Sequence, residues 1–341
     1  MRPFSYTRAG DVAAALAGLG ASPDAALLAG GTTLIELMKL TVMTPQTLID
    51  ITGLPREDAS LDSISTAADG GVRIGALTRM SDVAAHPLIV DGYPVVSEAL
   101  LKGASAQLRN MATIGGNLMQ RTRCTYFRDV TMPECNKRDP GSGCGARQGI
   151  HRPSAVLGAS ESCIATHPSD VAVAFVALDA AIEVQGEAGE RSIAARDFFL
   201  LPGDTPWQET ALGAHELITA VTLPPLPPGT RSHYLKVRDR ESYEFALASA
   251  AVAIQIVDGV IGHANIALGG VGTRPWHATT AEAALIGQAP STALFAAAAE
   301  TALAEAIPLG QNAFKVTLAR RTLERTLATI AGDDLATGEM R

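Results

Sequence analysis

The chain has 341 residues, of which 47% are apolar and 18% are charged, and its formal net charge is −8. This composition excludes a disordered chain, and the length predicts about two domains with a substantial buried core. The negative charge balance argues against a nucleic-acid-binding surface, which needs a basic stripe. No apolar run reaches the ~20 residues of a membrane span. Residues 1–10 lack the apolar core of a signal peptide, so we expect none in this chain.

The first 120 residues alternate strands and helices, which is the pattern of an α/β unit. A helix is expected at residues 11–20, where Asp11 is a favourable cap, and another at 81–86, capped by Ser81. Further helices are expected at 34–40 and 95–102, and strands at 26–30, 47–51 and 72–77.

Two glycine-rich turns lie in this part of the chain. In the first, LLAGGTTLIELMK at 27–39, an apolar strand leads through Gly30 and Gly31 into a helix. Glycines let the backbone approach a ligand, and successive N–H groups in such a turn can hold a pyrophosphate. The alternative is a plain strand–turn–helix without a ligand. The second turn, TIGGN at 113–117, suggests that one extended ligand is held at two points.

All the cysteines of the chain fall within 40 residues, at Cys124, Cys135, Cys144 and Cys163. Thiols clustered in a cytosolic chain more often bind metal than form disulfides. The stretch 121–149 is polar and rich in glycine and proline, so it cannot bury a core, and bound metal would supply its folding energy. An iron–sulfur cluster is favoured over zinc and over disulfides or free thiols.

Two further features of this stretch bear on the kind of metal. His151 and His167 lie nearby and would be available to a zinc site, although both can equally be ordinary loop histidines. Five basic residues could offset the negative charge of a thiolate-ligated cluster: Arg121, Arg123, Arg128, Lys137 and Arg138.

The C-terminal third predicts a different unit, a small antiparallel sheet followed by helices. Before it come a helix at 170–179 and strands at 181–185 and 217–223, and the proline-rich run 223–229 is the clearest linker. Beyond the linker we expect strands at 232–237, 245–257 and 260–268, the last two joined by an Asp258-Gly259 turn, and helices at 280–287, 291–306 and 312–330.

Patterns for acid–base or nucleophilic catalysis are missing from the sequence. It contains no GxSxG or HExxH motif, and its seven histidines are dispersed. Redox chemistry through bound cofactors is therefore the better interpretation, and we expect no catalytic side chain.

Four segments together resemble the FAD-binding subunit of molybdenum hydroxylases, the family of xanthine dehydrogenases, aldehyde oxidoreductases and carbon monoxide dehydrogenases. They read LAGGTTLIELMK, QLRNMATIGGNLMQRTRCTYFRD, HPSDVAVAFVALDA and YLKVRDRESYEFALASAAVAI. The resemblance implies an α+β fold with a two-lobed FAD-binding domain of the vanillyl-alcohol-oxidase type at 1–225. It further implies a cysteine-bearing loop at about 120–165, a C-terminal flavoprotein domain at 230–332, and a tail at 333–341.

The resemblance also implies the cofactor contacts. The first glycine turn would wrap the FAD pyrophosphate, the second would contact the pyrophosphate and ribityl region, and Asp170 would bond near the adenosine or ribityl part. Ile218 and Lys236 would lie near the isoalloxazine. The residues of the two turns are Leu28, Ala29, Gly30, Gly31, Thr32, Thr33 and Leu34, then Thr113, Gly116 and Asn117. The cysteine loop is similar to that of bacterial periplasmic aldehyde oxidoreductase flavoproteins, so the four cysteines would ligate a [4Fe–4S] cluster.

In such an enzyme the substrate is oxidised on a molybdopterin-containing large subunit, and electrons reach this FAD through a small subunit with [2Fe–2S] clusters. The resemblance thus implies an electron-transfer subunit of a heterotrimeric aldehyde oxidoreductase, exported to the periplasm with a partner that carries a twin-arginine signal, or otherwise cytoplasmic. Three alternatives remain at this point: a flavin subunit like that of 4-hydroxybenzoyl-CoA reductase, a stand-alone NAD(P)H flavin reductase, and a binding module with a zinc-stapled loop.

Overall fold

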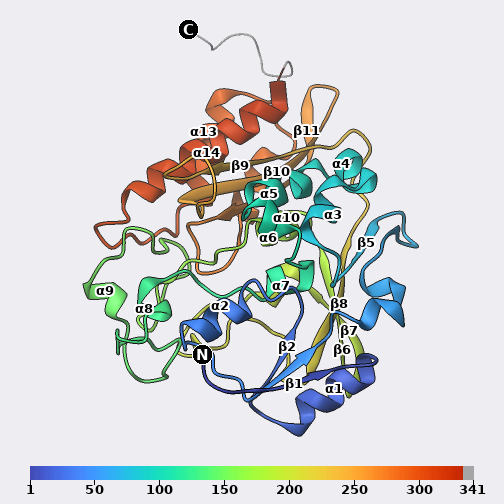
Figure 1. The fold of residues 1–341 in the computed structure, drawn as a ribbon. Helices are drawn as coiled ribbons and strands as arrows, with labels where there is room; N and C mark the ends of the chain where they lie inside the picture. Colours follow the sequence, from blue (N-terminus) through green and yellow to red (C-terminus); the bar gives the residue numbers. More distant parts are fainter. Residues whose placement is uncertain (333–341) are drawn as a thin grey trace.

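The computed structural model describes residues 1–332 and contains three sheets, which follow one another along the molecule from the N-terminal to the C-terminal end (Figure 1). The expected tail at 333–341 lies outside the described residues. The mixture of helices with parallel and antiparallel strands agrees with the predicted α+β class.

The N-terminal sheet is parallel, with strand order β1-β3-β2. Its strands are β1 (Ser5–Arg8), β2 (Ala25–Leu28) and β3 (Thr47–Asp50), and its helices are α1 (Val12–Ala21) and α2 (Leu34–Lys39). The predicted cap is confirmed, because Asp11 Oδ1 accepts a hydrogen bond from Ala14 N at 2.7 Å. Strand β1 was not predicted, since all four of its residues are exposed and no alternation marks it. This sheet delivers the first glycine turn, which follows β2 directly.

The Asp50 side chain at the end of β3 bonds to residues of β1 and of the following loop. Its carboxylate, 5% exposed, accepts hydrogen bonds from Thr52 N at 2.8 Å and from Arg8 Nη2 at 2.9 Å, and another from the Tyr6 hydroxyl. Burial alone would raise the pKa of Asp50, but these hydrogen bonds outweigh it and lower the pKa to about 2.

Asp50→Asn is expected to destabilise the chain by roughly 2 kcal/mol at pH 7, because the charged form is favoured in the folded state. A carboxyl whose folded pKa is lowered stabilises the fold above its unfolded pKa near 4 and loses that effect as pH falls to about 2. Denaturant unfolding should therefore show that the difference in free energy of unfolding between variant and wild type shrinks from pH 7 to pH 2. The exposed Asp91→Asn is the control. A difference that stays constant with pH would contradict the assignment.

The middle sheet is antiparallel throughout, with strand order β4-β5-β8-β6-β7. The α/β alternation seen in the sequence therefore does not extend into a parallel sheet beyond residue 60, because β5 pairs with the distant β8. The strands are β4 (Ile64–Thr66), β5 (Val72–Gly75), β6 (Ala181–Gly186), β7 (Gly189–Ala194) and β8 (Glu216–Leu223). The short 3-10 helices Leu54–Arg56 and Ala59–Leu61 precede it.

Helices pack over this sheet around α10, all of whose residues are buried. Helix α10 contacts α5 and the strands β10 and β11 of the C-terminal sheet, so it joins the two parts of the molecule. Ser81 is not a cap, contrary to expectation: Arg79 precedes α3 with no side-chain cap, and Ser81 Oγ bonds Asp82 instead. The helices are α3 (Met80–Ala85), α4 (Pro87–Gly92), α5 (Pro94–Lys102), α6 (Ala106–Arg109), α7 (Ile114–Leu118), α10 (Asp170–Ala177) and α11 (Ala195–Phe198).

The C-terminal sheet has strand order β12-β11-β10-β9 and is antiparallel, as expected. Figure 1 shows α13 and α14 over this sheet. Strand β10 begins three residues later than expected, because Tyr243 adopts a positive φ of 52° and the chain turns before it. The elements are β9 (Arg231–Val237), β10 (Ala248–Val257), β11 (Val260–Gly269), β12 (Trp276–His277), α12 (Thr279–Leu285), α13 (Thr292–Ala302) and α14 (Phe314–Ala331).

The cysteine segment, which we define as residues 120–165, lies beside α2 (Figure 1). Its regular structure consists of the one-turn helices α8 (Thr125–Arg128) and α9 (Gly145–Gln148), an isolated bridge between Cys135 and Cys144, and another between Leu157 and Gly272. Leu37 of α2 packs against Phe127 and Cys135, so the segment is in contact with the element that follows the first glycine turn. Within residues 1–332, no helix has both the length and the apolar character needed to cross a bilayer.

Candidate functional site: a dinucleotide cradle

The two glycine turns meet at the wall between two cavities. The first cavity, of about 300 Å³, and the second, of about 450 Å³, share Thr32, Thr33, Gly116 and Gln120 in their linings. Two cavities joined at glycine turns suit a ligand with two bulky ends and a narrow middle, which is the shape of a dinucleotide.

Gly30 is required by the close approach of the two turns. A Cβ atom at Gly30 would lie 2.0 Å from the main-chain oxygen of Met111, just before the second turn. Gly31 has a positive φ of 71°, a conformation that favours glycine. The sequence predicted glycines here for contact with a ligand, and the structure adds that they also let two segments of the backbone touch.

The first turn offers free backbone donors. The N–H groups of Gly31, Thr32 and Thr33 donate to no acceptor in the part of the chain that the structure describes. Thr32 and Thr33 line both cavities, and Gly31 lines the first. Consecutive N–H groups of this kind form an anion-binding concavity. The observed donors therefore fit a pyrophosphate, which is one of the two interpretations that the turn's sequence left open.

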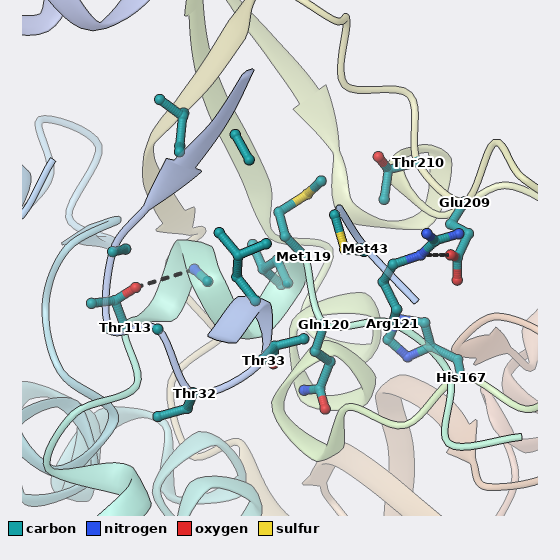
Figure 2. A pocket seen from close by; sticks show the side chains of 18 of the residues that line it. Thr32, Thr33, Met43, Thr113, Met119, Gln120, Arg121, His167, Glu209 and Thr210 are labelled. Atoms are coloured by element: carbon teal, nitrogen blue, oxygen red, sulfur yellow. Dashed lines mark hydrogen bonds and ion pairs between the residues drawn. The ribbon is translucent and has the colours of Figure 1, made fainter. Parts of the chain in front are cut away.

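The second turn is braced from within. Thr113 Oγ1 accepts a hydrogen bond from Gly116 N at 3.2 Å and begins α7 (Figure 2). The Asn117 side chain accepts from Ser169 Oγ at 2.6 Å and from Gln120 Nε2 at 2.9 Å, which ties the turn to the start of α10. Asn117 thus holds the wall of the second cavity in place as well as lining it.

Charged and aromatic groups form the far side of the first cavity. Figure 2 shows Arg121 and Glu209 side by side at its wall, joined by a hydrogen bond of 2.5 Å from Arg121 Nε to Glu209 Oε1. His167 lies next to them and packs edge-on against Phe199. Burial lowers the pKa of His167 to about 4, so the ring is neutral at pH 7.

A buried ion pair forms the base of the second cavity. Lys236 Nζ, on β9, lies 2.8 Å from Asp170 Oδ2, on α10, and the Tyr234 hydroxyl donates to Asp170 Oδ1 at 2.6 Å. The Lys236 and Asp170 side chains are 1% and 8% exposed. Burial raises the pKa of Asp170, while the Lys236 ammonium and the Tyr234 hydroxyl counteract part of that rise.

The structure assembles most of the predicted cofactor residues and separates two. Residues 29–34, Thr113 and Gly116 line the first cavity, and Asn117, Asp170 and Lys236 line the second. Leu28 lines neither cavity: its side chain lies near Gly31, behind the turn. Ile218 is 8% exposed within the core of the middle sheet and also lines neither. Asp170 and Lys236 form one ion pair, so both would contact the same part of a dinucleotide.

Sequence reasoning missed the remaining lining residues, because they come from loops distant from the glycine turns. Gln120 stands directly after the second turn, and this position was the available signal. The others belong to no motif that marks a binding site: Met43, Trp207, Glu209 and Thr210 in the first cavity, and Arg240, Tyr243 and Phe245 in the second.

All four cysteines line one further cavity, of about 10 Å³, together with Phe127 and Lys137 among others. None of them forms a disulfide. Burial raises the pKa of Cys163 to about 11 and also raises that of Cys124. Among residues 1–332, no group of three or more His, Cys, Asp or Glu side chains is arranged to hold a metal ion. The chain thus brings the four thiols together without a preformed single-ion site.

Most of the other candidate residues of this segment lie away from the thiols. Neither histidine joins the thiols, because the His151 ring bonds the carbonyls of Gly149 and Leu309, and His167 lines the first cavity. Of the five basic side chains, Lys137 alone lines the thiol cavity. The four arginines bond elsewhere because nearby carboxylates and carbonyls are stronger acceptors: Arg121 meets Glu209, Arg123 and Arg128 meet Glu36, and Arg138 meets the carbonyls of Tyr126, Phe127, Asp129 and Met132.

Known proteins match nearly the whole chain. Residues 2–226 match the family described as the FAD binding domain in molybdopterin dehydrogenase, and residues 233–330 match the CO dehydrogenase flavoprotein C-terminal domain. The chain is 50% identical to the aldehyde oxidoreductase FAD-binding subunit PaoB of Escherichia coli, over 96% of this chain and 98% of that protein. It is 31% identical to the glyceraldehyde dehydrogenase medium chain of Sulfolobus acidocaldarius, over 84% and 82% of the two chains. Carbon monoxide dehydrogenase from Hydrogenophaga pseudoflava has a similar structure, with a TM-score of 0.75 and 28% identity over 98% of this chain and 99% of that one.

The chain therefore belongs to the FAD-binding flavoproteins of the molybdenum hydroxylase family. Within that family it is an oxidoreductase subunit of the aldehyde oxidoreductase type, as the resemblance in its sequence implied. The similarities do not favour the 4-hydroxybenzoyl-CoA reductase, stand-alone flavin reductase or binding-module alternatives.

Proposed function

We propose that FAD binds across the two cavities, with its pyrophosphate on the wall that they share. The observation that carries this proposal is the row of free N–H groups from Gly31 to Thr33 between two cavities. Contacts would come from Ala29, Leu34, Thr113, Gly116 and Asn117 in addition. Leu28 and Ile218, which line neither cavity, would support the site from behind.

We further propose that the isoalloxazine half of FAD occupies the second cavity. The pyrimidine edge of an isoalloxazine carries an N–H donor between two carbonyl acceptors. The Asp170 carboxylate and the Lys236 ammonium at the base of that cavity supply the complementary acceptor and donor. The first cavity, with neutral His167 and the Thr210 hydroxyl in its lining, would then take the adenosine half.

FAD, when bound, accepts electrons and passes them on, and the chain's own residues bind it, orient it and exclude water from it. We propose that the electrons come from an aldehyde oxidised on a molybdopterin-containing large subunit, by way of a [2Fe–2S] small subunit, and leave to an external acceptor. This assembly is supported by the relatives, several of which are described as medium chains or subunits of larger enzymes. The particular aldehyde would be selected on the large subunit.

The anaerobic absorption spectrum of the purified chain, before and after dithionite, tests both cofactors. We expect flavin bands together with a broad shoulder near ~400 nm, both bleached on reduction. Flavin bands without the shoulder would keep the FAD proposal and remove the cluster. A colourless chain that regains no flavin bands when FAD is added would contradict the proposed function.

The thiol cavity is the proposed site of a [4Fe–4S] cluster held by Cys124, Cys135, Cys144 and Cys163. Four thiols with no disulfide around one cavity support this assignment, because four cysteine thiolates hold such clusters. Burial raises the pKa of Cys163 to about 11, and a thiol must lose its proton to act as a metal ligand.

Cys135→Ser is expected to lower the iron content of the chain from about four atoms to near zero, because a hydroxyl is a poor replacement for a thiolate ligand. Iron and acid-labile sulfide analysis measures this loss. Ala165→Ser is the control, since it adds a hydroxyl to the same cavity and removes no thiol. Unchanged iron in the Cys135 variant would remove that cysteine from the ligand set.

We propose two further assignments. One is that the chain divides at its proline-rich run into an FAD-binding domain at 1–225 and a C-terminal domain at 230–332.

The other is that the assembled complex is exported to the periplasm on the twin-arginine signal of a partner. Cell fractionation with and without that partner tests the second assignment, and equal amounts in the periplasm in both cases would contradict it.

A further inference from the structure

Four cationic side chains of the cysteine segment form ion pairs with two carboxylates outside it. Glu36 accepts hydrogen bonds from Arg123 Nη1 at 2.8 Å and Nη2 at 3.0 Å, and Arg128 Nη2 lies 2.5 Å from Glu36 Oε1. Glu209 is bonded by Arg121 Nε at 2.5 Å and lies 3.1 Å from Lys137 Nζ. Two carboxylates from outside the segment are thus each held by two of its cations.

Each carboxylate lines a different half of the dinucleotide cradle. Glu209, with Arg121, lines the first cavity, where Figure 2 shows the pair at the wall. Glu36, with Arg123, lines the second cavity. Arg123 also lies over the ring of Phe245, 5.0 Å from its centroid, and this ring lines the second cavity too. The position of both walls therefore depends on side chains of the cysteine segment.

Each carboxylate is linked to the thiol cavity through one neighbour, Lys137 for Glu209 and Leu37 for Glu36. Lys137 lines that cavity, and its charge lowers the pKa of Cys163 in part against the stronger effect of burial. Leu37, next to Glu36, packs against Phe127 and Cys135. A change in the fold around the thiols consequently reaches Glu209 through Lys137 and Glu36 through α2.

Two of the four cations in these groups are largely buried. The side chains of Arg128 and Lys137 are only 12% and 9% exposed, so each needs its carboxylate as a counter-charge. Within residues 1–332, Arg128 Nη1 is buried without any hydrogen-bond partner, which makes its bond to Glu36 through Nη2 the more important. Burial would raise the pKa of Glu209, but Lys137 and Arg121 outweigh it and the pKa is lowered, so Glu209 is charged.

We propose that Glu36 and Glu209 are positioning residues that make FAD affinity depend on the folded state of the cysteine segment. This inference rests on the proposed binding of FAD in the cradle. A segment folded around its thiols holds both carboxylates, and the carboxylates hold the two cavity walls. Coupling between two sites is reciprocal, so FAD in the cradle also stabilises the segment.

The first test measures the FAD dissociation constant of the full-length chain by fluorescence titration. Glu36→Gln and Glu209→Gln keep the side-chain size and remove the charge, and each is expected to weaken FAD binding about 5- to 50-fold. Glu161→Gln is the matched control: this residue pairs with Arg147 of the same segment, but its side chain is 91% exposed and lines neither cavity. The control should bind FAD within about twofold of the wild type.

The second test asks whether the effect passes through the segment. Cys163→Ser disturbs the segment directly, and we expect Cys163→Ser combined with Glu209→Gln to weaken FAD binding by clearly less than the product of the two single effects. In metal-free wild type, FAD should slow the reaction of the cysteines with a thiol reagent such as DTNB, and Glu209→Gln should remove that protection. A merely destabilising substitution changes the melting temperature but not this protection by FAD.

The outcomes separate this inference from the proposed function. A wild-type chain that binds no FAD contradicts the proposed function. If the wild type binds FAD and both glutamine variants bind it equally well, the inference is wrong and the proposed function stands. Fold-changes that multiply in the double variant also overturn the inference. Should Glu209→Gln fail to fold, Arg121→Lys, which keeps the charge and alters the geometry of the bond, is measured in its place against the same expectations.

Discussion

Gly30→Ala should give a chain that is purified almost free of flavin. The added Cβ would lie 2.0 Å from the Met111 carbonyl oxygen and 3.0 Å from the Ala112 Cα, and these atoms belong to the main chain and cannot rotate away. The two glycine turns must therefore move apart, which disturbs the wall that both cavities share. Overpacking of this kind costs about 1–3 kcal/mol or more, and here the displaced atoms are those proposed to hold the pyrophosphate.

The measurement is the ratio of bound FAD to protein, with a thermal melt to confirm folding. Gly92→Ala is the matched control, because a Cβ at Gly92 meets nothing within 4 Å and its φ is not positive. We expect full flavin content in the control and less than a tenth in the Gly30 variant. A Gly30 variant with stoichiometric FAD would show that the contact between the turns is not needed for binding.

Asp170→Asn is expected to have the largest effect on stability, about 3–5 kcal/mol. Lys236 Nζ would remain buried with the Lys102 carbonyl as its acceptor and without a counter-charge. The pair joins α10 to β9 beneath the second cavity, so the loss should be seen both in denaturant unfolding and in FAD content.

A second substitution separates stability from binding. Asp170→Asn combined with Lys236→Met removes both charges and should recover part of the lost stability, because the uncompensated ammonium is gone. It should not recover FAD, since the proposed donor and acceptor are both absent. Asp239→Asn is the control: its ion pair with Arg152 is about half exposed on both sides, so its loss should cost less than about 1 kcal/mol. Full FAD binding by the double variant would contradict the assigned role of the pair.

Local sequence signals were sufficient for elements whose pattern carries its own physics. The Asp11 cap, the buried helix from Asp170 and the Asp258-Gly259 hairpin were all found, because capping, apolar composition and turn chemistry are properties of a few neighbouring residues. The exposed strand β1 was missed, and β8 could not be assigned to its partner β5, because pairing between residues as far apart as Val72 and Leu223 leaves no local mark.

The candidate site likewise has features that local sequence predicts and features that depend on packing. The glycine turns and the four cysteines could be recognised from composition and order alone, because a backbone cradle needs glycine and a cluster needs thiols. That Asp170 and Lys236 form one buried pair, and that Ile218 lies in the core, depended on how α10, β8 and β9 pack.

By itself, then, the sequence determined the two glycine turns and the gathering of thiols in one segment, since these depend on residue type over short spans, and its family resemblance indicated the α+β class. The tertiary structure alone decided which charges meet. The sequence suggested that the basic residues of the cysteine segment could offset the charge of a cluster, and in the structure Arg121, Arg123 and Arg128 bond Glu209 and Glu36. The partner of a charged side chain depends on distance and burial in the folded chain, and neither quantity can be read from the order of the residues.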